Sequence, residues 1–182
     1  VWIMAYTTID KPSDYFNTKL YTGDGGTQSV TGVGFQPDWT WIKNRGSSDS
    51  HNVYDSVRGV TKYLLPNNNV AEDTTSGVTA FNSDGFSVGN NSMTNSNSNN
   101  YASWNWKAGT SFTNDASGTG IGSIDSAGSF NNDSGFSIVS YTGLGSNATV
   151  KHGMNQKPSM IIFKRRVGSG WNWTTYHKSM GN

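Results

Sequence analysis

The chain contains no cysteine in its 182 residues. This absence excludes disulfide bonds, zinc sites with thiolate ligands and cysteine nucleophiles. Charged residues are also scarce, at 14 %, where soluble domains average about 25 %. The net charge of +1 gives no electrostatic argument for nucleic-acid binding. No apolar run approaches the roughly 18 residues of a membrane span. The sequence therefore predicts no membrane insertion, and the near-zero net charge predicts no nucleic-acid partner.

Small polar residues and aromatic residues make up for the low share of charged residues in the composition. Aromatic residues make up 13 % of the chain, whereas Ser, Thr, Asn and Gly are poor helix formers. The polar tract at 91–100 is predicted to be a long hairpin loop. Strand-length runs recur between turn residues, so the sequence predicts an all-β fold, an antiparallel β-sandwich of jelly-roll or lectin-like type. The predicted strands lie within 18–23, 27–35, 38–45, 51–57, 61–66, 85–89, 101–109, 135–143, 148–154, 159–166 and 171–178.

An internal repeat relates the two halves of the chain. LYTGDGGTQSVTGVGFQPDWTWIKNR (20–45) aligns with SYTGLGSNATVKHGMNQKPSMIIFKRR (140–166), with an offset of 120 at Tyr-Thr-Gly and 121 at the proline. A looser match joins VYDSVRG (53–59) to TYHKSMG (175–181). The repeat predicts four parts. They are a leader (1–10), a first β-module (11–108), a Gly/Ser-rich connector with at most one strand (109–135), and the first half of a second, truncated module (136–182).

The strand that follows Pro37 carries two tryptophans. Alternation along a strand places Trp39 and Trp41 on the same face as Lys43. The second copy has Met160 and Ile162 at the tryptophan positions, which preserves apolar volume but not an aromatic surface. The pattern therefore favours a core position for the two tryptophans, with a stacking platform for a ligand as the alternative.

Eight residues are candidates for contacts with a ligand or a partner. The basic strand ends predict either a solvated end paired with carboxylates, or a contact with an acidic glycan, a phosphate or a neighbouring subunit. Tryptophans two residues apart share a strand face and predict either core packing or a surface on which sugar rings stack. The pair nearest the C-terminus is expected to be poorly covered. The candidates are Lys43, Arg45, Lys164, Arg166, Trp104, Trp106, Trp171 and Trp173.

Catalytic patterns are weak throughout the chain. The three histidines follow no metal-binding spacing, and Glu72 is the only glutamate, so a glycosidase pair of carboxylates is not evident. A loop calcium site that includes Asp24 or Asp133 is a minor alternative. The sequence therefore predicts no catalytic residue, no metal site and no cofactor.

The repeat resembles one found in tail-fibre and other virion proteins of marine bacteriophages, cyanophages among them. The segments that resemble it are GFQPDWTWIKNR, DSVRG, SDGFSVG, WNWKAG, GFSIVSYTG and PSMIIFKRR, and the start MAYTTIDKPSDYFNTKLYTG resembles the start of such chains. The resemblance implies a β-rich module in a virion tail or surface appendage, without catalytic residues.

The same resemblance implies partners. They are other virion proteins, further copies of the chain in a homo-oligomer such as a trimer, and a glycan of the host surface. The expected function is non-enzymatic assembly and host attachment. Two alternatives remain open, namely a capsid-decorating or filament-forming protein and, less favoured, a tailspike-like glycan depolymerase.

Overall fold

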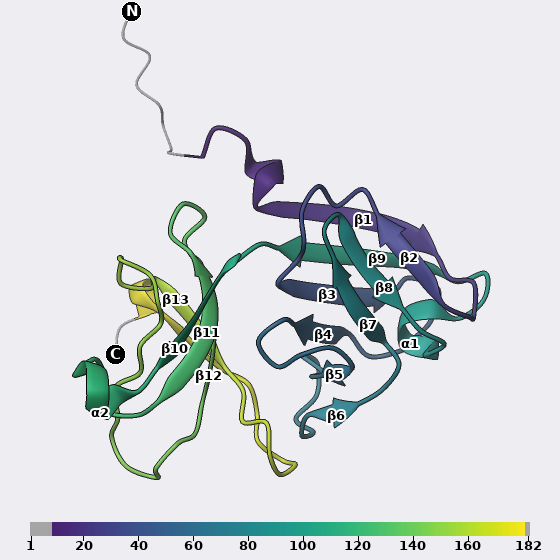
Figure 1. Cartoon of the computed structure of the whole chain (residues 1–182). Helices are drawn as coiled ribbons and strands as arrows, with labels where there is room; N and C mark the ends of the chain where they lie inside the picture. Colours follow the sequence, from purple (N-terminus) through teal and green to yellow (C-terminus); the bar gives the residue numbers. More distant parts are fainter. Residues whose placement is uncertain (1–8, 181–182) are drawn as a thin grey trace, which may run out of the picture.

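The computed structural model describes residues 9–180, so most of the expected leader lies outside the described residues. The chain is almost entirely β-structure in antiparallel sheets, which confirms the predicted all-β, sandwich-like fold. Figure 1 shows two bodies joined by the segment that follows β9, and we call them the first and second modules. The strands of the first module are β1 (Phe16–Thr22), β2 (Gln28–Thr31), β3 (Trp39–Asn44), β4 (Asn52–Asp55), β5 (Lys62–Tyr63), β6 (Asp73–Thr74), β7 (Val78–Asn82), β8 (Gly85–Val88) and β9 (Asn100–Trp106).

The first module is a sandwich of two antiparallel sheets. One sheet has the order β1-β9-β3-β4, and the other has the order β2-β8-β7. The short β5–β6 ribbon continues the first sheet through a bridge between Val53 and Leu64. Apolar side chains from both sheets meet between them, and this burial is the main source of stability. The core cluster is Val30, Ile42, Tyr54, Val78, Phe86, Val88 and Tyr101.

The prediction that Trp39 and Trp41 point into the core is wrong. Along β3 the fully buried positions are Thr40, Ile42 and Asn44, which face the second sheet. The tryptophans share a face, as alternation requires, but it is the outer face of the sheet. Hydrophobicity alone misassigns this strand because the outer face is itself partly covered by the second module.

Polar side chains fill part of the space between the sheets. Asn105 is fully buried, accepts a hydrogen bond from Thr40 Oγ1 at 3.1 Å and donates to the Asn17 carbonyl at 3.1 Å. These bonds satisfy groups that would be costly to bury alone.

The polar tract at 91–100 is not the plain hairpin loop that its composition predicts. It holds a single helical turn, α1 (Ser92–Asn95), capped by Asn91, whose side chain accepts from the Met93 amide. Asn95 is fully buried, and its amide donates to Asp24 Oδ1 at 2.8 Å and accepts from Gln28 Nε2 at 2.6 Å. Short polar side chains bond readily to nearby groups, so this tract closes the β1–β2 loop.

The expected connector is more structured than predicted. It contains two strands, β10 (Thr110–Asn114) and β11 (Ser126–Asn131), with the short helix α2 (Ala116–Thr119) between them. They form a sheet in the order β10-β11-β12 with β12 (Phe136–Tyr141), whereas β13 (Met160–Phe163) and β14 (Thr174–His177) form a separate hairpin. These five strands make up the second module. Turns of 3₁₀-helix lie at each end, η1 (Pro12–Asp14) and η2 (Lys178–Met180).

The predicted strand at 148–154 is absent from the structure. Its carbonyls accept single hydrogen bonds instead of pairing in a ladder: from the Ser123 amide to the Thr149 carbonyl at 2.9 Å, from Ser126 Oγ to the Lys151 carbonyl at 3.3 Å, and from Ser137 Oγ to the His152 carbonyl at 2.6 Å. No helix formed by residues 9–180 has the length and apolar character needed to span a membrane.

Candidate binding site at the seam between the modules

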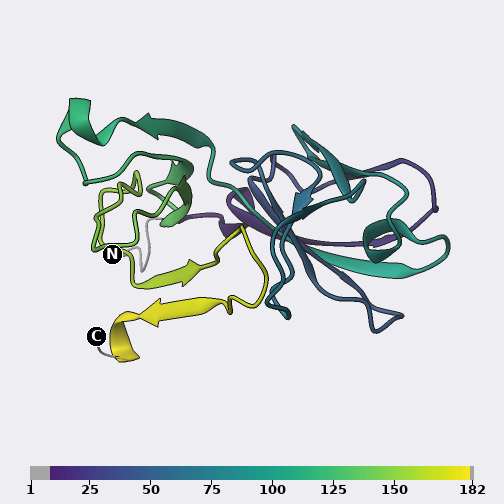
Figure 2. The ribbon, with the colours of Figure 1, turned by 90° about the horizontal axis from the view of Figure 1, so that it is seen from below.

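The loop that joins β13 to β14 extends to the first module, where it meets the turn between β5 and β6 (Figures 1 and 2). Two backbone hydrogen bonds join these segments. The Glu72 amide donates to the Arg166 carbonyl at 2.9 Å, and the Gly170 amide donates to the Asn69 carbonyl at 3.0 Å. We call this contact the seam.

A carboxylate between two guanidinium groups fixes one end of the seam. Glu72 accepts from Arg166 Nε at 2.9 Å and Nη2 at 2.8 Å, and from Arg58 Nη1 at 3.1 Å. Arg58 also pairs with Asp55, and Arg166 Nη1 donates to Ser140 Oγ at 3.0 Å. Burial acts to raise the pKa of Glu72, but the hydrogen bonds from Arg166 and Arg58 outweigh it, and the pKa is lowered. The carboxylate is therefore held ionised as a link between the modules.

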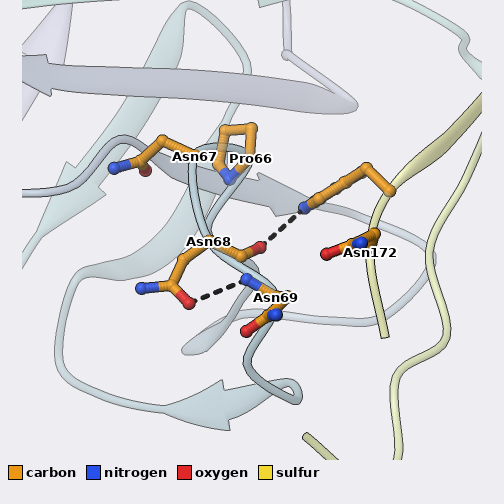
Figure 3. A pocket seen from close by; sticks show the side chains of 6 residues that line it. Pro66, Asn67, Asn68, Asn69 and Asn172 are labelled. Atoms are coloured by element: carbon orange, nitrogen blue, oxygen red, sulfur yellow. Dashed lines mark hydrogen bonds between the residues drawn. The ribbon is translucent and has the colours of Figure 1, made fainter. Parts of the chain in front are cut away.

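A hollow of about 490 Å³ lies beside this link, with walls from both modules (Figure 3). Trp173 forms part of its wall, and its indole Nε1 donates to the Leu65 carbonyl at 2.9 Å and to the Asn68 carbonyl at 3.2 Å. Asn68 Oδ1 accepts from the Asn69 amide at 2.7 Å, which shapes the turn. The lining residues are Pro66, Asn67, Asn68, Asn69, Asn172 and Trp173.

Two asparagines of the hollow have unused hydrogen-bonding capacity. Within the described part of the chain, no hydrogen bond uses the side-chain amide of Asn69 or Asn172, and both residues are exposed. Each amide offers two N–H donors and one carbonyl acceptor. Because the polar edge of Trp173 is already bonded, its ring contributes mainly apolar surface. An aromatic face beside free amides suits a ligand with an apolar face and a rim of hydroxyl groups.

Two further candidates lie on the second-module side of the seam. Lys164 Nζ donates to the Trp171 carbonyl at 2.8 Å and approaches the Asn69 carbonyl at 3.5 Å, and burial lowers its pKa. Trp171 is 53 % exposed, and the Arg165 guanidinium lies 4.6 Å from its ring centroid. The structure thus brings four of the eight candidates together at the seam: Lys164, Arg166, Trp171 and Trp173.

A comparison with known families matches residues 11–182 to the family DUF7483. The chain belongs to the DUF7483 family. This family is described as a domain of unknown function. No curated protein and no solved structure matches the chain. The match spans both modules, so the seam lies inside the DUF7483 domain.

The other four candidates of the DUF7483 chain lie in the first module, apart from the seam. Lys43 does not pair with a carboxylate, contrary to that prediction. Its ammonium donates to the carbonyls of Ser47 at 2.9 Å and Asp49 at 2.7 Å and so closes the β3–β4 loop. Arg45 is exposed, and its backbone amide donates to the Asn100 carbonyl at 2.7 Å. Of these two residues, Arg45 is the more exposed to solvent.

This role of Lys43 predicts a structural cost. Lys43→Ala is expected to lower the free energy of unfolding by about 1 kcal/mol, because two loop carbonyls lose a charged donor at a partly exposed site. Arg45→Ala is the matched control and is expected to change it by less than about 0.5 kcal/mol. Urea denaturation of the two variants measures both values, and equal effects would contradict the assignment.

Trp104 and Trp106 lie on the outer face of the sheet, not in the core between the sheets. Trp106 lies 5.1 Å from Trp39 between ring centroids, and Phe136 of the second module stacks on Trp39 at 5.6 Å with the planes 9° apart. Trp104 meets Trp41 edge-on at 6.4 Å. One end of this aromatic face is therefore a contact between the modules, and only the end around Trp104 and Trp41 remains partly open.

Sequence reasoning missed the asparagines and Glu72. The run Asn67 to Asn69 after Pro66 marks a turn, but no local signal indicates that Trp173 comes beside it from more than 100 residues away. Over residues 9–180, no group of three or more His, Asp or Glu side chains is arranged to hold a metal ion.

Proposed function

We propose that this DUF7483 chain is a non-enzymatic structural protein of a bacteriophage virion, a module of a tail fibre or related appendage. The resemblance of its repeat to marine phage tail-fibre proteins supports the location. The seam supports a role in attachment, because the hollow there combines an aromatic face with free amides. The proposed ligand is a neutral or weakly acidic glycan of the host surface, in contact with Asn69, Asn172 and Trp173.

The hollow is shallow and polar, which suits weak single sites. Several weak contacts on one appendage add through effective concentration, so each need not bind tightly. Lys164 and Arg166 hold the walls of the hollow in this proposal, since their charged groups are already bonded to protein atoms. Arg165, whose guanidinium lies 4.6 Å from the Trp171 ring centroid, carries a charge on the same loop of the second module.

Glycan binding by the seam is tested with substitutions that leave the fold intact. Asn172→Ala is expected to weaken binding roughly five- to tenfold, because it removes one or two hydrogen bonds to the ligand. Asn147→Ala, at an exposed asparagine in the loop after β12, is the matched control and is expected to bind like the wild type. A glycan array identifies the ligand, and titration calorimetry then compares the three proteins. If no glycan binds and host cells do not retain the protein, the attachment role is lost.

The depolymerase alternative is disfavoured by the state of Glu72. A glycosidase acid needs a raised pKa and access to the substrate, whereas the pKa of Glu72 is lowered and both oxygens are bonded to arginines. Incubation with host polysaccharide and measurement of released reducing ends tests this directly. Release by the wild type would overturn the non-enzymatic proposal.

A filament or decoration role is the second candidate. It is favoured by the edge of β13: among residues 9–180 this strand pairs with β14 alone, so its other edge has no ladder partner there. Sedimentation velocity over a range of concentrations separates the two roles, since a filament protein forms an open series of oligomers and a fibre protein forms a closed one.

A further inference from the structure

Three strands of the second module correspond in sequence and, for one pair, in register to three strands of the first. In the first module Trp39 lies opposite Asp55, and Ile42 lies opposite Asn52. In the second module the aligned positions pair in the same way, with Met160 opposite His177 and Phe163 opposite Thr174. The Tyr-Thr-Gly match places β12 in the position of β1. Thus β12, β13 and β14 correspond to β1, β3 and β4.

The second module lacks a counterpart of β9 within the described residues. In the first module β9 lies between β1 and β3 and pairs with both in antiparallel register. In the described part of the second module, β12 is the edge of its sheet and β13 pairs only with β14. Figure 2 shows the β13–β14 hairpin lying separate from the sheet that ends in β12. Both facing edges therefore keep backbone groups without ladder partners, a known template for strand addition.

The apolar side chains beside these edges are uncovered as well. Phe163 is 39 % exposed, whereas its counterpart Ile42 in the first module is fully buried. Tyr141 is 44 % exposed, whereas its counterpart Tyr21 packs against the core cluster. Arg166 extends from the end of β13 to Ser140 on β12, so the two edges remain close to each other.

We infer that the second module binds an extended polypeptide strand of the β9 type between β12 and β13. The strand runs antiparallel to both neighbours. Its Tyr, Ser and Asn positions face Phe163 and Tyr141, and its tryptophans face outward, as Tyr101, Ser103 and Asn105 alternate with Trp104 and Trp106 in β9. Two ladders of backbone hydrogen bonds and the burial of the exposed apolar residues drive binding. This inference does not depend on the glycan site.

A synthetic peptide with the sequence NNYASWNWKAG tests the inference on the full chain. Fluorescence anisotropy is expected to show saturable binding with one peptide per protein. Hydrogen exchange is expected to show new protection in β12 and β13 and no change in the first module. A peptide of the same composition in shuffled order is expected not to bind. No saturable binding, or protection confined to the first module, would overturn the inference.

Two proline variants locate the site. Because the Arg45 amide donates to β9, alternation also directs the Trp41 amide and that of its counterpart Ile162 to the same side. Ile162→Pro removes that donor and is expected to weaken peptide binding about tenfold or more. Thr175→Pro is the control, since its amide lies on the far edge of β14, and it is expected to bind within about twofold of the wild type. Equal binding by Ile162→Pro and the wild type would contradict the proposed position.

Discussion

Replacing Glu72 by glutamine is expected to lower the free energy of unfolding by about 2–3 kcal/mol. The carboxylate accepts from Arg166 through two nitrogens and from Arg58 through one. Glutamine has nearly the same volume as glutamate but carries no charge. Its side-chain NH₂ group would also replace one oxygen that now accepts a hydrogen bond from an arginine. Arg58, which is buried, is then left partly unpaired, and this is the costliest part of the change. Urea denaturation monitored by circular dichroism measures the difference.

Asp73→Asn provides the matched control for this variant. Asp73 is the next residue along the chain and is exposed. Among residues 9–180 it accepts only a long bond of 3.4 Å from Tyr63 and a local bond from the Thr74 amide at 2.7 Å. Its replacement is expected to change the free energy of unfolding by less than about 1 kcal/mol. If both variants lost the same stability, Glu72 would have no special role at the seam.

The effect of Glu72→Gln is also expected to depend on pH. Burial raises the pKa of Glu72, but the bonds from the two arginines outweigh it and the folded-state pKa lies below the ordinary value, which is about 4.3 in an unfolded chain. A carboxyl with a lowered folded-state pKa stabilises the protein fully above the unfolded value and loses this effect as the pH falls through the folded value. The difference between wild type and variant should therefore be largest near neutral pH and shrink in acid.

The fold class could be predicted from sequence because it depends on local patterns. Turn residues and short apolar runs predict most strands of the first module near their observed positions, and the repeat alone aligns β13 and β14 with β3 and β4. Which face of each strand points into the core is harder to predict from sequence. Trp39 is more hydrophobic than Thr40, yet Thr40 points into the core, where Asn105 accepts a hydrogen bond from its hydroxyl. A one-residue choice of this kind depends on the partner strand and not on the strand itself.

The site could be predicted only in part, for a similar reason. The sequence indicates basic residues at strand ends and tryptophan pairs as candidates, and four of them meet at the seam. It does not indicate that Glu72 is the partner of Arg166, because the packing of two modules brings these residues together. Long-range ion pairs leave no periodic signal in a single sequence. The same holds for Phe136, which reaches Trp39 across the modules.

Replacing Phe86 by alanine is expected to lower the free energy of unfolding by about 3–5 kcal/mol, more than the loss expected for Glu72→Gln. Phe86 lies on β8, is fully buried in the cluster between the two sheets, and meets Tyr21 edge-on with the ring centroids 6.1 Å apart. Its removal leaves a cavity that the rigid sheets cannot close, so lost burial and lost packing add. Denaturation in urea, with the midpoint and slope fitted together, measures the loss.

Leu20→Ala is the matched control for Phe86→Ala. Leu20 is also a large apolar residue on a strand of the first module, but it lies on the outer face and is 61 % exposed. Its truncation is expected to cost less than about 1 kcal/mol. A large loss for Phe86 and a small one for Leu20 would place the core between the two sheets, with the tryptophans outside it. Equal losses would mean that the outer face is buried in solution, and the aromatic end around Trp104 and Trp41 would then have to be an interface between copies of the chain.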